Sequence, residues 1–159
     1  MSDAARCFAL VPCAGVGARA GEGGPKQYAP LAGQAVVAHT LAALASVPEI
    51  AATLVVLASG DMAFEQHAPR FTGARAWVAR CGGATRAASV TAGLAVLREH
   101  GVVDEDWVLV HDAARCLLQP AWVQRLIRAC RGDAVGGLLA LPLADTLKAS
   151  QTDRVVATL

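Results

Sequence analysis

The sequence has little net charge and lacks long apolar runs and paired cysteine motifs, and each of these features argues against a class of protein. With a formal net charge of +1, bulk electrostatics gives no reason to expect a nucleic acid as partner. No run approaches the roughly 18 apolar residues of a membrane span, and the first residues, MSDAARCFALVP, lack the basic region and cleavage site of a secretory signal. The five cysteines include no C-x-x-C pair, which argues against a disulfide framework or a zinc site. We therefore expect a cytoplasmic protein that binds neither nucleic acid nor membranes.

Apolar segments alternate with helical patterns along the chain. Continuous apolar runs predict strands at residues 6–11, 53–58, 75–79, 107–110 and 135–141. Helical spacing of apolar residues, or a proline placed to open a helix, predicts helices within 34–46, 62–67, 86–100 and 120–130. Such alternation predicts one α/β domain with a mostly parallel sheet and helices on both faces.

Four unusual segments each follow a predicted strand. They are VPCAGVGARAGEGGPKQY at 11–28, CGGATRAAS at 81–89, HDAAR at 111–115 and PLADTLK at 142–148. In open α/β sheets, ligands bind beyond the carboxyl ends of the strands. We therefore expect the four segments to gather at one edge of the sheet and to form the functional site.

The first segment is a glycine-rich loop that fits neither standard phosphate-binding motif. Gly15 and Gly17 satisfy G-x-G-x-x-A, but residues 23–48 contain no acidic residue where a dinucleotide fold needs one. No G-K-[ST] occurs, which excludes a Walker A loop. Bare glycine amides can face an anion at close range, and Arg19 and Lys26 would add positive charge. The loop is thus either an anion site or an ordinary surface loop with solvated cations.

The second segment is likewise a candidate nucleotide-binding loop. Gly82 and Gly83 allow a ligand to approach the backbone closely. Thr85 or Ser89 could cap the following helix and leave amides free for a nucleotide. A simple turn followed by a helix cap explains the same residues.

The third and fourth segments carry the remaining candidate residues. Asp112 could bind, directly or through water, a magnesium ion that carries phosphates. Arg115 could hold a second phosphate through its planar guanidinium, or else form an ion pair with Asp112. Asp145 and Thr146 could bind substrate hydroxyls or cap a turn. The four scattered histidines form no nucleophile–base pattern.

The four segments, in this order and at these separations, closely resemble the motifs of the 2-C-methyl-D-erythritol 4-phosphate cytidylyltransferases. The resemblance covers the chain from Phe8 onward. A glycine-rich loop ending in P-K-Q is shared by many sugar nucleotidyltransferases, whereas its combination with GGATRAASV and HDAAR is more specific. The resemblance implies a Rossmann-like nucleotidyltransferase fold, CTP as co-substrate, Mg²⁺ and methylerythritol phosphate as the second substrate. It also implies a homodimer for the full-length protein.

The resemblance assigns roles to individual residues. Arg19 and Lys26 match the catalytic cations. The nucleotide-binding positions are Cys13, Ala14, Gly15, Gly17, Gly82, Gly83 and Ser89. Asp112 matches the acidic position near the metal and the sugar phosphate, and the other substrate-binding positions are Arg115, Asp145 and Thr146.

The chain departs from the family in two residues and in length. Cys13 replaces the usual alanine, and Cys116 replaces the proline that commonly follows HDAAR. Family members run further than Leu159, so we expect residues 1–159 to be one incomplete nucleotidyltransferase domain in which a projecting arm begins at about 143–159. The alternatives are a cytidylyltransferase for another polyol phosphate such as ribitol 5-phosphate, a dinucleotide-dependent oxidoreductase, and an inactive nucleotide-binding fragment.

Overall fold

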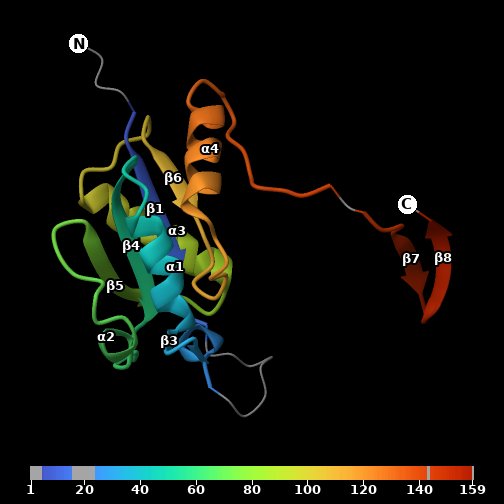
Figure 1. The fold of residues 1–159 in the computed structure, drawn as a ribbon, viewed down its shortest axis with the longest axis horizontal. Coiled ribbons are helices and arrows are strands. Elements are labelled where there is room, and N and C mark those ends of the chain that lie inside the picture. Colours follow the sequence, from blue (N-terminus) through green and yellow to red (C-terminus); the bar gives the residue numbers. More distant parts are fainter. Residues whose placement is uncertain (1–4, 16–23, 143, 159) are drawn as a thin grey trace.

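A four-stranded parallel sheet forms the centre of the molecule (Figure 1). The computed structural model describes residues 5–15, 24–142 and 144–158. The strands are β1 (Cys7–Pro12), β4 (Ile50–Ala58), β5 (Ala76–Gly82) and β6 (Trp107–Val110), in the order β5-β4-β1-β6. The predictions of an α/β fold and of the first four strands are therefore confirmed.

Helices cover both faces of this sheet. They are α1 (Val36–Ala45), the short α2 (Phe64–His67), α3 (Arg86–Glu99) and α4 (Pro120–Cys130). A 3-10 turn, η1 (Lys26–Tyr28), and a small hairpin of β2 (Pro30–Leu31) and β3 (Gln34–Ala35) precede α1. All four predicted helices are confirmed, with small shifts at their ends. Among the described residues no helix is long and apolar enough to cross a membrane.

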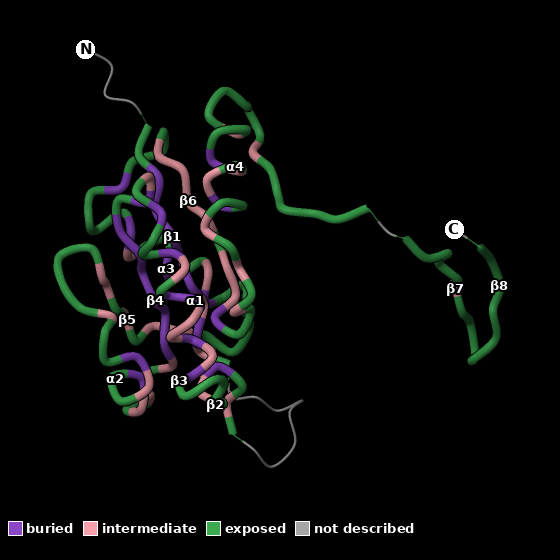
Figure 2. The backbone as a smooth tube through the Cα atoms, viewed as in Figure 1, coloured by how far each residue is buried: buried purple, intermediate pink, exposed green. Residues whose placement is uncertain are grey.

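The central strand β1 separates two hydrophobic clusters. Because successive side chains of a strand point to opposite faces, Ala9 and Val11 pack with α1 and α4, whereas Phe8 and Leu10 pack with α3. The strand is buried along its length (Figure 2). This two-sided burial explains why the strand is a continuous apolar run in the sequence.

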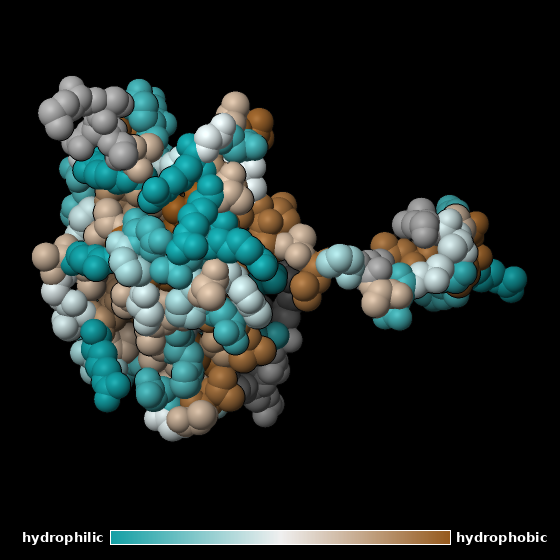
Figure 3. Space-filling model, turned by 45° about the horizontal axis from the view of Figure 1, so that its top comes forward, coloured by the Kyte–Doolittle hydropathy of each residue, from teal (hydrophilic) through white to brown (hydrophobic). Residues whose placement is uncertain are grey.

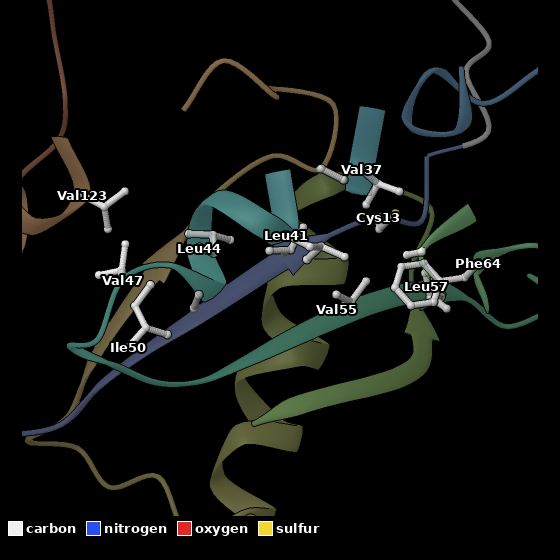
Figure 4. Packing of buried hydrophobic residues seen from close by; sticks show 14 of the residues in the cluster. Cys13, Val37, Leu41, Leu44, Val47, Ile50, Val55, Leu57, Phe64 and Val123 are labelled. Carbon is white, nitrogen blue, oxygen red and sulfur yellow. The ribbon is translucent and has the colours of Figure 1, made fainter. Parts of the chain in front are cut away.

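Helix α1 shows how the spacing of apolar residues decides packing. Val37, Leu41 and Leu44 follow one another at intervals of a helical turn, so they share one face and point toward the sheet (Figure 4). They meet Val55 and Leu57 of β4 in the same cluster. Burying a side chain of this size contributes roughly 1.5–3 kcal/mol.

The prediction of a fifth strand at 135–141 was wrong. These residues form neither strand nor helix, and Val135 and Leu141 are each 93% exposed. The segment begins beside Trp107 and Cys130, where Gly136 and Gly137 approach their side chains, and then leaves the body with its apolar residues on the surface (Figure 3). A strand needs a partner, and adjacent glycines weaken an extended segment that has none. Among the described strands, β6 pairs with β1 alone.

Beyond this segment, a second hairpin lies apart from the body (Figures 1 and 2). It consists of β7 (Lys148–Gln151) and β8 (Arg154–Thr158), paired antiparallel. Thr152 and Asp153 form its two-residue turn with positive φ angles of 47° and 59°, the backbone that tight hairpin turns require. Nearly all residues of this hairpin are exposed.

An ion pair fastens the start of β1 to the start of β6. Arg6 donates to both carboxylate oxygens of Asp106, from Nε at 3.2 Å and from Nη2 at 2.5 Å. The backbone amides of Arg6 and Val103 donate to the same carboxylate at 2.9 and 3.0 Å. Hydrogen bonds from the Arg6 side chain, opposed by burial, lower the pKa of Asp106. The side chain of Asp106 is only 3% exposed, so this carboxylate depends on its partners.

We expect Asp106→Asn to lower the free energy of unfolding by about 2 kcal/mol at pH 7, the usual value of a hydrogen bond to a charged group. The pKa of Asp106 is lower in the folded than in the unfolded chain, so its stabilisation is complete above the unfolded pKa of about 4. It is lost as the pH falls through the folded pKa. Urea unfolding at pH 7 and pH 3 measures both effects. If wild type and Asp106→Asn differ in free energy of unfolding by the same amount at pH 3 as at pH 7, this account is wrong. Asp104→Asn, at an exposed carboxylate, is the control.

Candidate functional site

The carboxyl ends of β1, β4 and β5 meet where the glycine-rich loop begins. The amide of Cys13 donates to the carbonyl of Val56 at 2.8 Å, which holds the chain against β4 just beyond the end of β1. On the other side, a Cβ placed on Gly82 would lie 2.2 Å from Cβ of Ala14 and 2.7 Å from the carbonyl oxygen of Leu57. The first and second segments are therefore in contact, as predicted.

The two ends of the glycine-rich loop are held together by Gln27. Its buried side-chain amide donates to the carbonyls of Cys13 at 3.2 Å and of Gly15 at 2.9 Å. Lys26 lies next to it on the same turn and is exposed. Gly17 and Arg19 lie outside the described residues. The loop thus leaves the end of β1 and returns to it, with Lys26 at the point of return.

The second segment is braced by its own side chains. Thr85 is the N-cap of α3 and accepts from the amide of Ala88 at 3.0 Å, so it is Thr85, and not Ser89, that caps the helix. Ser89 is buried, and its hydroxyl accepts from the amide of Gly83 at 3.1 Å and donates to the carbonyl of Thr85 at 3.1 Å. Ser89 therefore fixes the turn at Gly82 and Gly83.

Asp112 lies between two arginines at the end of β6. One of its carboxylate oxygens accepts from Nε of Arg86 at 2.7 Å, and the other accepts from Nε of Arg115 at 2.8 Å. Burial opposes ionisation of Asp112, but the two guanidinium groups outweigh it and lower its pKa. Both guanidinium groups are mostly exposed. The arrangement is a carboxylate flanked by two anion-binding groups that solvent can reach.

Arg86 is a site residue that the sequence analysis did not single out. It follows the cap Thr85 at the start of α3, and that position turns its side chain toward the third segment. The available signal was the arginine inside GGATR, directly after a predicted cap. The ion pair between Asp112 and Arg115, one of the two alternatives for these residues, is present and has Arg86 as a third member.

Two side chains hold the third segment in place through its backbone carbonyls. The side chain of Thr40 on α1 donates to the carbonyl of Ala113 at 2.9 Å. The ring of His111 is hydrogen-bonded through Nε2 to the carbonyl of Arg115 at 2.9 Å. This histidine therefore holds the turn of its own segment.

The fourth segment does not join the other three. Asp145 and Thr146 are exposed in the extended stretch that leads away from the body to β7 (Figure 1). The prediction that all four segments gather at one edge of the sheet was therefore wrong for PLADTLK. The physical reason is the missing fifth strand, since a strand at 135–141 would have carried these residues back to the sheet edge.

The surroundings of the site residues bear on thiol chemistry and on metal binding. Burial, with a further contribution from Asp61, raises the pKa of the Cys13 thiol to about 12, so this thiol is protonated at neutral pH and is a poor nucleophile. Within 5–15, 24–142 and 144–158, no three residues of the types His, Cys, Asp and Glu are grouped to hold a metal ion. A metal at Asp112 would thus need ligands from a bound molecule or water.

Comparison with known proteins decides the family. The family model of IspD, 2-C-methyl-D-erythritol 4-phosphate cytidylyltransferase, matches residues 7–159. The chain belongs to the IspD family. The resemblance seen in the four segments is thereby confirmed.

Individual relatives agree with this assignment to IspD. The chain is 60% identical over 154 residues to the bifunctional enzyme IspD/IspF of Albidiferax ferrireducens, covering 97% of this chain and 36% of that protein. It is 54% identical over 143 residues to the 2-C-methyl-D-erythritol 4-phosphate cytidylyltransferase of Burkholderia vietnamiensis, covering 90% of this chain and 60% of that protein. The crystal structure of a 4-diphosphocytidyl-2C-methyl-D-erythritol synthase superimposes with a TM-score of 0.84 at 36% identity, covering 99% of this chain and 70% of that one. This IspD chain therefore spans 36% of the length of the Albidiferax ferrireducens relative and 60% of that of the Burkholderia vietnamiensis relative.

Gly82 gives a stability test of how the first two segments of this IspD chain are packed. We expect Gly82→Ala to lower the free energy of unfolding by about 2 kcal/mol, because the new Cβ meets Ala14 and the backbone of Leu57, neither of which can rotate away. Urea denaturation measures the change. Gly60→Ala is the matched control, since a Cβ there meets no atom within 4 Å. Equal stability of the two variants would contradict the packing described here.

Proposed function

We propose that the protein transfers CMP from CTP to 2-C-methyl-D-erythritol 4-phosphate and releases pyrophosphate. The product is 4-diphosphocytidyl-2-C-methyl-D-erythritol. Membership of the IspD family and similarity to the 2-C-methyl-D-erythritol 4-phosphate cytidylyltransferase of Burkholderia vietnamiensis support this reaction. The observation that carries the proposal is the carboxylate of Asp112 held between Arg86 and Arg115 at the sheet edge where the glycine segments also end.

The proposed reaction needs electrostatic stabilisation more than acid–base chemistry. A phosphate oxygen of the polyol phosphate attacks the α-phosphorus of CTP, a new P–O bond forms, and the bond to the leaving pyrophosphate breaks. The second pKa of a phosphate monoester is about 6, so the attacking oxygen is already ionised at neutral pH. The obstacle is repulsion between two anions and the charge that develops on the transferring group. This explains why a site without a nucleophile–base pair suits the reaction.

Lys26 and Arg19 are proposed as the cations that meet this charge. Lys26 is exposed at the point where the glycine-rich loop returns to the end of β1, so its ammonium can reach a triphosphate held by that loop. Arg19 lies outside the described residues, and its role rests on the family resemblance. The backbone of residues 13–15 and of Gly82 and Gly83 is proposed to contact the nucleotide, and the buried Ser89 to hold that turn in place.

Asp112 fits a magnesium ion that arrives with the nucleotide. Mg²⁺ in phosphate-transfer sites is bound by one or two carboxylates together with substrate phosphates and water, and Asp112 offers one partly exposed carboxylate. When bound, Mg²⁺ would offset charge on the phosphates. Arg86 and Arg115 would then be free to bind phosphate oxygens of the two substrates. Asp145 and Thr146 lie apart from the other three segments in this chain (Figure 1), and the proposal that they contact the polyol phosphate has support from the family resemblance alone.

The assembly and location of the protein are also proposals. We propose that the full-length protein is a cytoplasmic homodimer in which the arm that contains β7 and β8 contributes to the interface. The exposed Val155 and Val156 on β8 give that arm an apolar surface suited to such a contact.

Release of pyrophosphate tests the proposed reaction. CTP and Mg²⁺ are incubated with the protein and either methylerythritol phosphate or ribitol 5-phosphate, and pyrophosphate is measured over time. We expect release that depends on methylerythritol phosphate. Faster release with ribitol 5-phosphate would assign a different polyol phosphate, and CTP binding without release from either would indicate an inactive fragment. The 159-residue chain and a full-length version are assayed side by side.

A further inference from the structure

Lys26 is placed by its two neighbours on a single turn of backbone. The turn η1 is closed by hydrogen bonds from the amide of Tyr28 to the carbonyl of Pro25, at 2.9 Å, and from the amide of Ala29 to the carbonyl of Lys26, at 3.2 Å. Gln27 attaches this turn to the start of the glycine-rich loop. At the end of the turn, the carbonyl of Ala29 accepts from the amide of Val36 at 3.0 Å. A further attachment through a side chain of the turn itself would limit its rotation and so fix the direction in which Lys26 points.

Tyr28 provides that further attachment. Its hydroxyl donates to Oδ2 of Asp61 at 2.5 Å, and its ring stacks on His67 with centroids 4.6 Å apart and planes 10° from parallel. Burial, together with the neighbouring carboxylate of Asp61, raises the pKa of Tyr28. Tyr28 therefore keeps its proton at neutral pH and remains a donor to Asp61.

Asp61 is itself held by three elements. Its backbone amide donates to the carbonyl of Ala58 at the end of β4, at 3.1 Å. Its other carboxylate oxygen, Oδ1, accepts from the amides of Ala63 at 2.9 Å and Phe64 at 3.1 Å, at the start of α2. Its carbonyl accepts from Nε of Arg80 on β5 at 2.9 Å. Asp61 is thus a fixed point of the body, and both of its carboxylate oxygens are in use.

We propose that the hydrogen bond between Tyr28 and Asp61 positions Lys26, which makes Tyr28 and Asp61 positioning residues for the transfer of CMP. The inference rests on the proposed function, because it takes Lys26 as the catalytic cation. Gln27 fixes the turn to the end of β1, and Tyr28 fixes it to the end of β4, so the two bonds set the orientation of the residue beside them. A misplacement of about 1 Å can cost a catalytic group roughly a hundredfold in rate.

Tyr28→Phe tests the inference because it removes the hydroxyl and keeps the ring. The stack on His67 and both hydrogen bonds of Gln27 can remain, so the variant loses only the hydrogen bond between Tyr28 and Asp61. In the full-length protein we expect kcat to fall about tenfold with KM for CTP changed less than twofold, since a misaimed Lys26 weakens stabilisation of the transition state more than binding. We also expect amide hydrogen exchange of residues 24–29 to accelerate at least fivefold.

Trp77→Phe is the matched control. It removes another aromatic donor, whose Nε1 bonds to the carbonyl of Ala74 at 3.0 Å at the opposite end of β5. We expect this variant to change neither the kcat nor the exchange of residues 24–29. A purely structural effect of losing an aromatic hydrogen bond would appear in both variants alike.

A double-mutant cycle ties the effect to this one bond. Asp61→Ser keeps an oxygen that can accept from the amides of Ala63 and Phe64, which serine does well at the start of a helix, but its shorter side chain cannot also hold Tyr28. We expect Tyr28→Phe to lower kcat less than twofold when Asp61→Ser is already present. Full additivity of the two changes would contradict a shared role.

The outcomes separate this inference from the proposed function. If wild type releases pyrophosphate and Tyr28→Phe matches Trp77→Phe in kcat, the positioning role is overturned, whatever the exchange rates are. If Tyr28→Phe lowers kcat without faster exchange at 24–29, an effect through the turn is overturned as well. If wild type releases no pyrophosphate with either polyol phosphate, the proposed function fails and the catalytic part of the inference falls with it. In that case the exchange data still test whether Tyr28 anchors the turn.

Discussion

Replacing Lys26 by alanine is expected to reduce the rate of CMP transfer about a hundredfold and to leave the fold unchanged. Losing one preorganised charged contact with a transition state costs on the order of 3 kcal/mol, which corresponds to that factor. Lys26 is exposed, and its side chain makes no hydrogen bond or ion pair with the part of the chain that the structure describes. Its removal therefore costs little stability. Steady-state kinetics with saturating CTP measures the loss, and thermal unfolding checks the fold.

Arg98→Ala is the control for Lys26→Ala. Arg98 is an exposed cation in the last turn of α3 and pairs with Asp104, well removed from the carboxyl ends of the strands. Its loss changes the net charge by the same amount. Near-normal turnover in Lys26→Ala, or an equal loss in Arg98→Ala, would contradict a local role for the Lys26 ammonium.

Asp112→Asn is expected to have the second large effect, a loss of turnover on the order of a hundredfold. Asparagine keeps the shape but removes the charge that balances Arg86 and Arg115 and that would attract Mg²⁺. We also expect the concentration of Mg²⁺ at half-maximal rate to rise at least fivefold. Because the pKa of Asp112 is lowered, its carboxylate stays ionised above about pH 4. Wild type should therefore show no loss of activity from this group between pH 5 and 8.

A magnesium titration of the initial rate, in wild type and in Asp112→Asn, measures both quantities. Asp104→Asn is the control, since Asp104 is an exposed carboxylate that also pairs with an arginine. If the rate of Asp112→Asn falls without any change in its response to Mg²⁺, the metal part of the proposal is wrong and Asp112 acts through the arginines alone.

The sheet and its helices could be predicted because each segment has an apolar pattern that is typical of a strand or of a helix. The strand at β4 is a continuous apolar run, and the inner face of α1 repeats at helical intervals. The segment at 135–141 has the same apolar character but is not a strand, because strand formation also requires a neighbouring edge and a backbone without adjacent glycines. That one error also misplaced Asp145 and Thr146, which depended on it.

The site residues that lie within short sequence motifs could be predicted, but the contacts between those motifs could not. Gly82, Ser89 and Asp112 lie in short motifs, and each is near the strand end where it was expected. The contacts between segments could not be predicted in the same way. Arg86 meets Asp112 because α3 starts beside the end of β6, and Tyr28 meets Asp61 across 33 positions of sequence. Such pairs depend on how the elements pack, and no single stretch of sequence encodes them.

The place of β1 at the centre of the sheet has a consequence for synthesis. Of the four strands of this sheet, β1 is synthesised first, and one of its two neighbours, β6, begins only at Trp107, a hundred residues after Cys7. During elongation the nascent chain must therefore carry an apolar segment with one side unoccupied, at a pace of roughly 5–20 residues per second. The pairing of β1 with β6 therefore forms late, and because it joins residues far apart in the sequence it slows folding. Until then, residues 7–12 are an exposed apolar segment of the kind that favours aggregation.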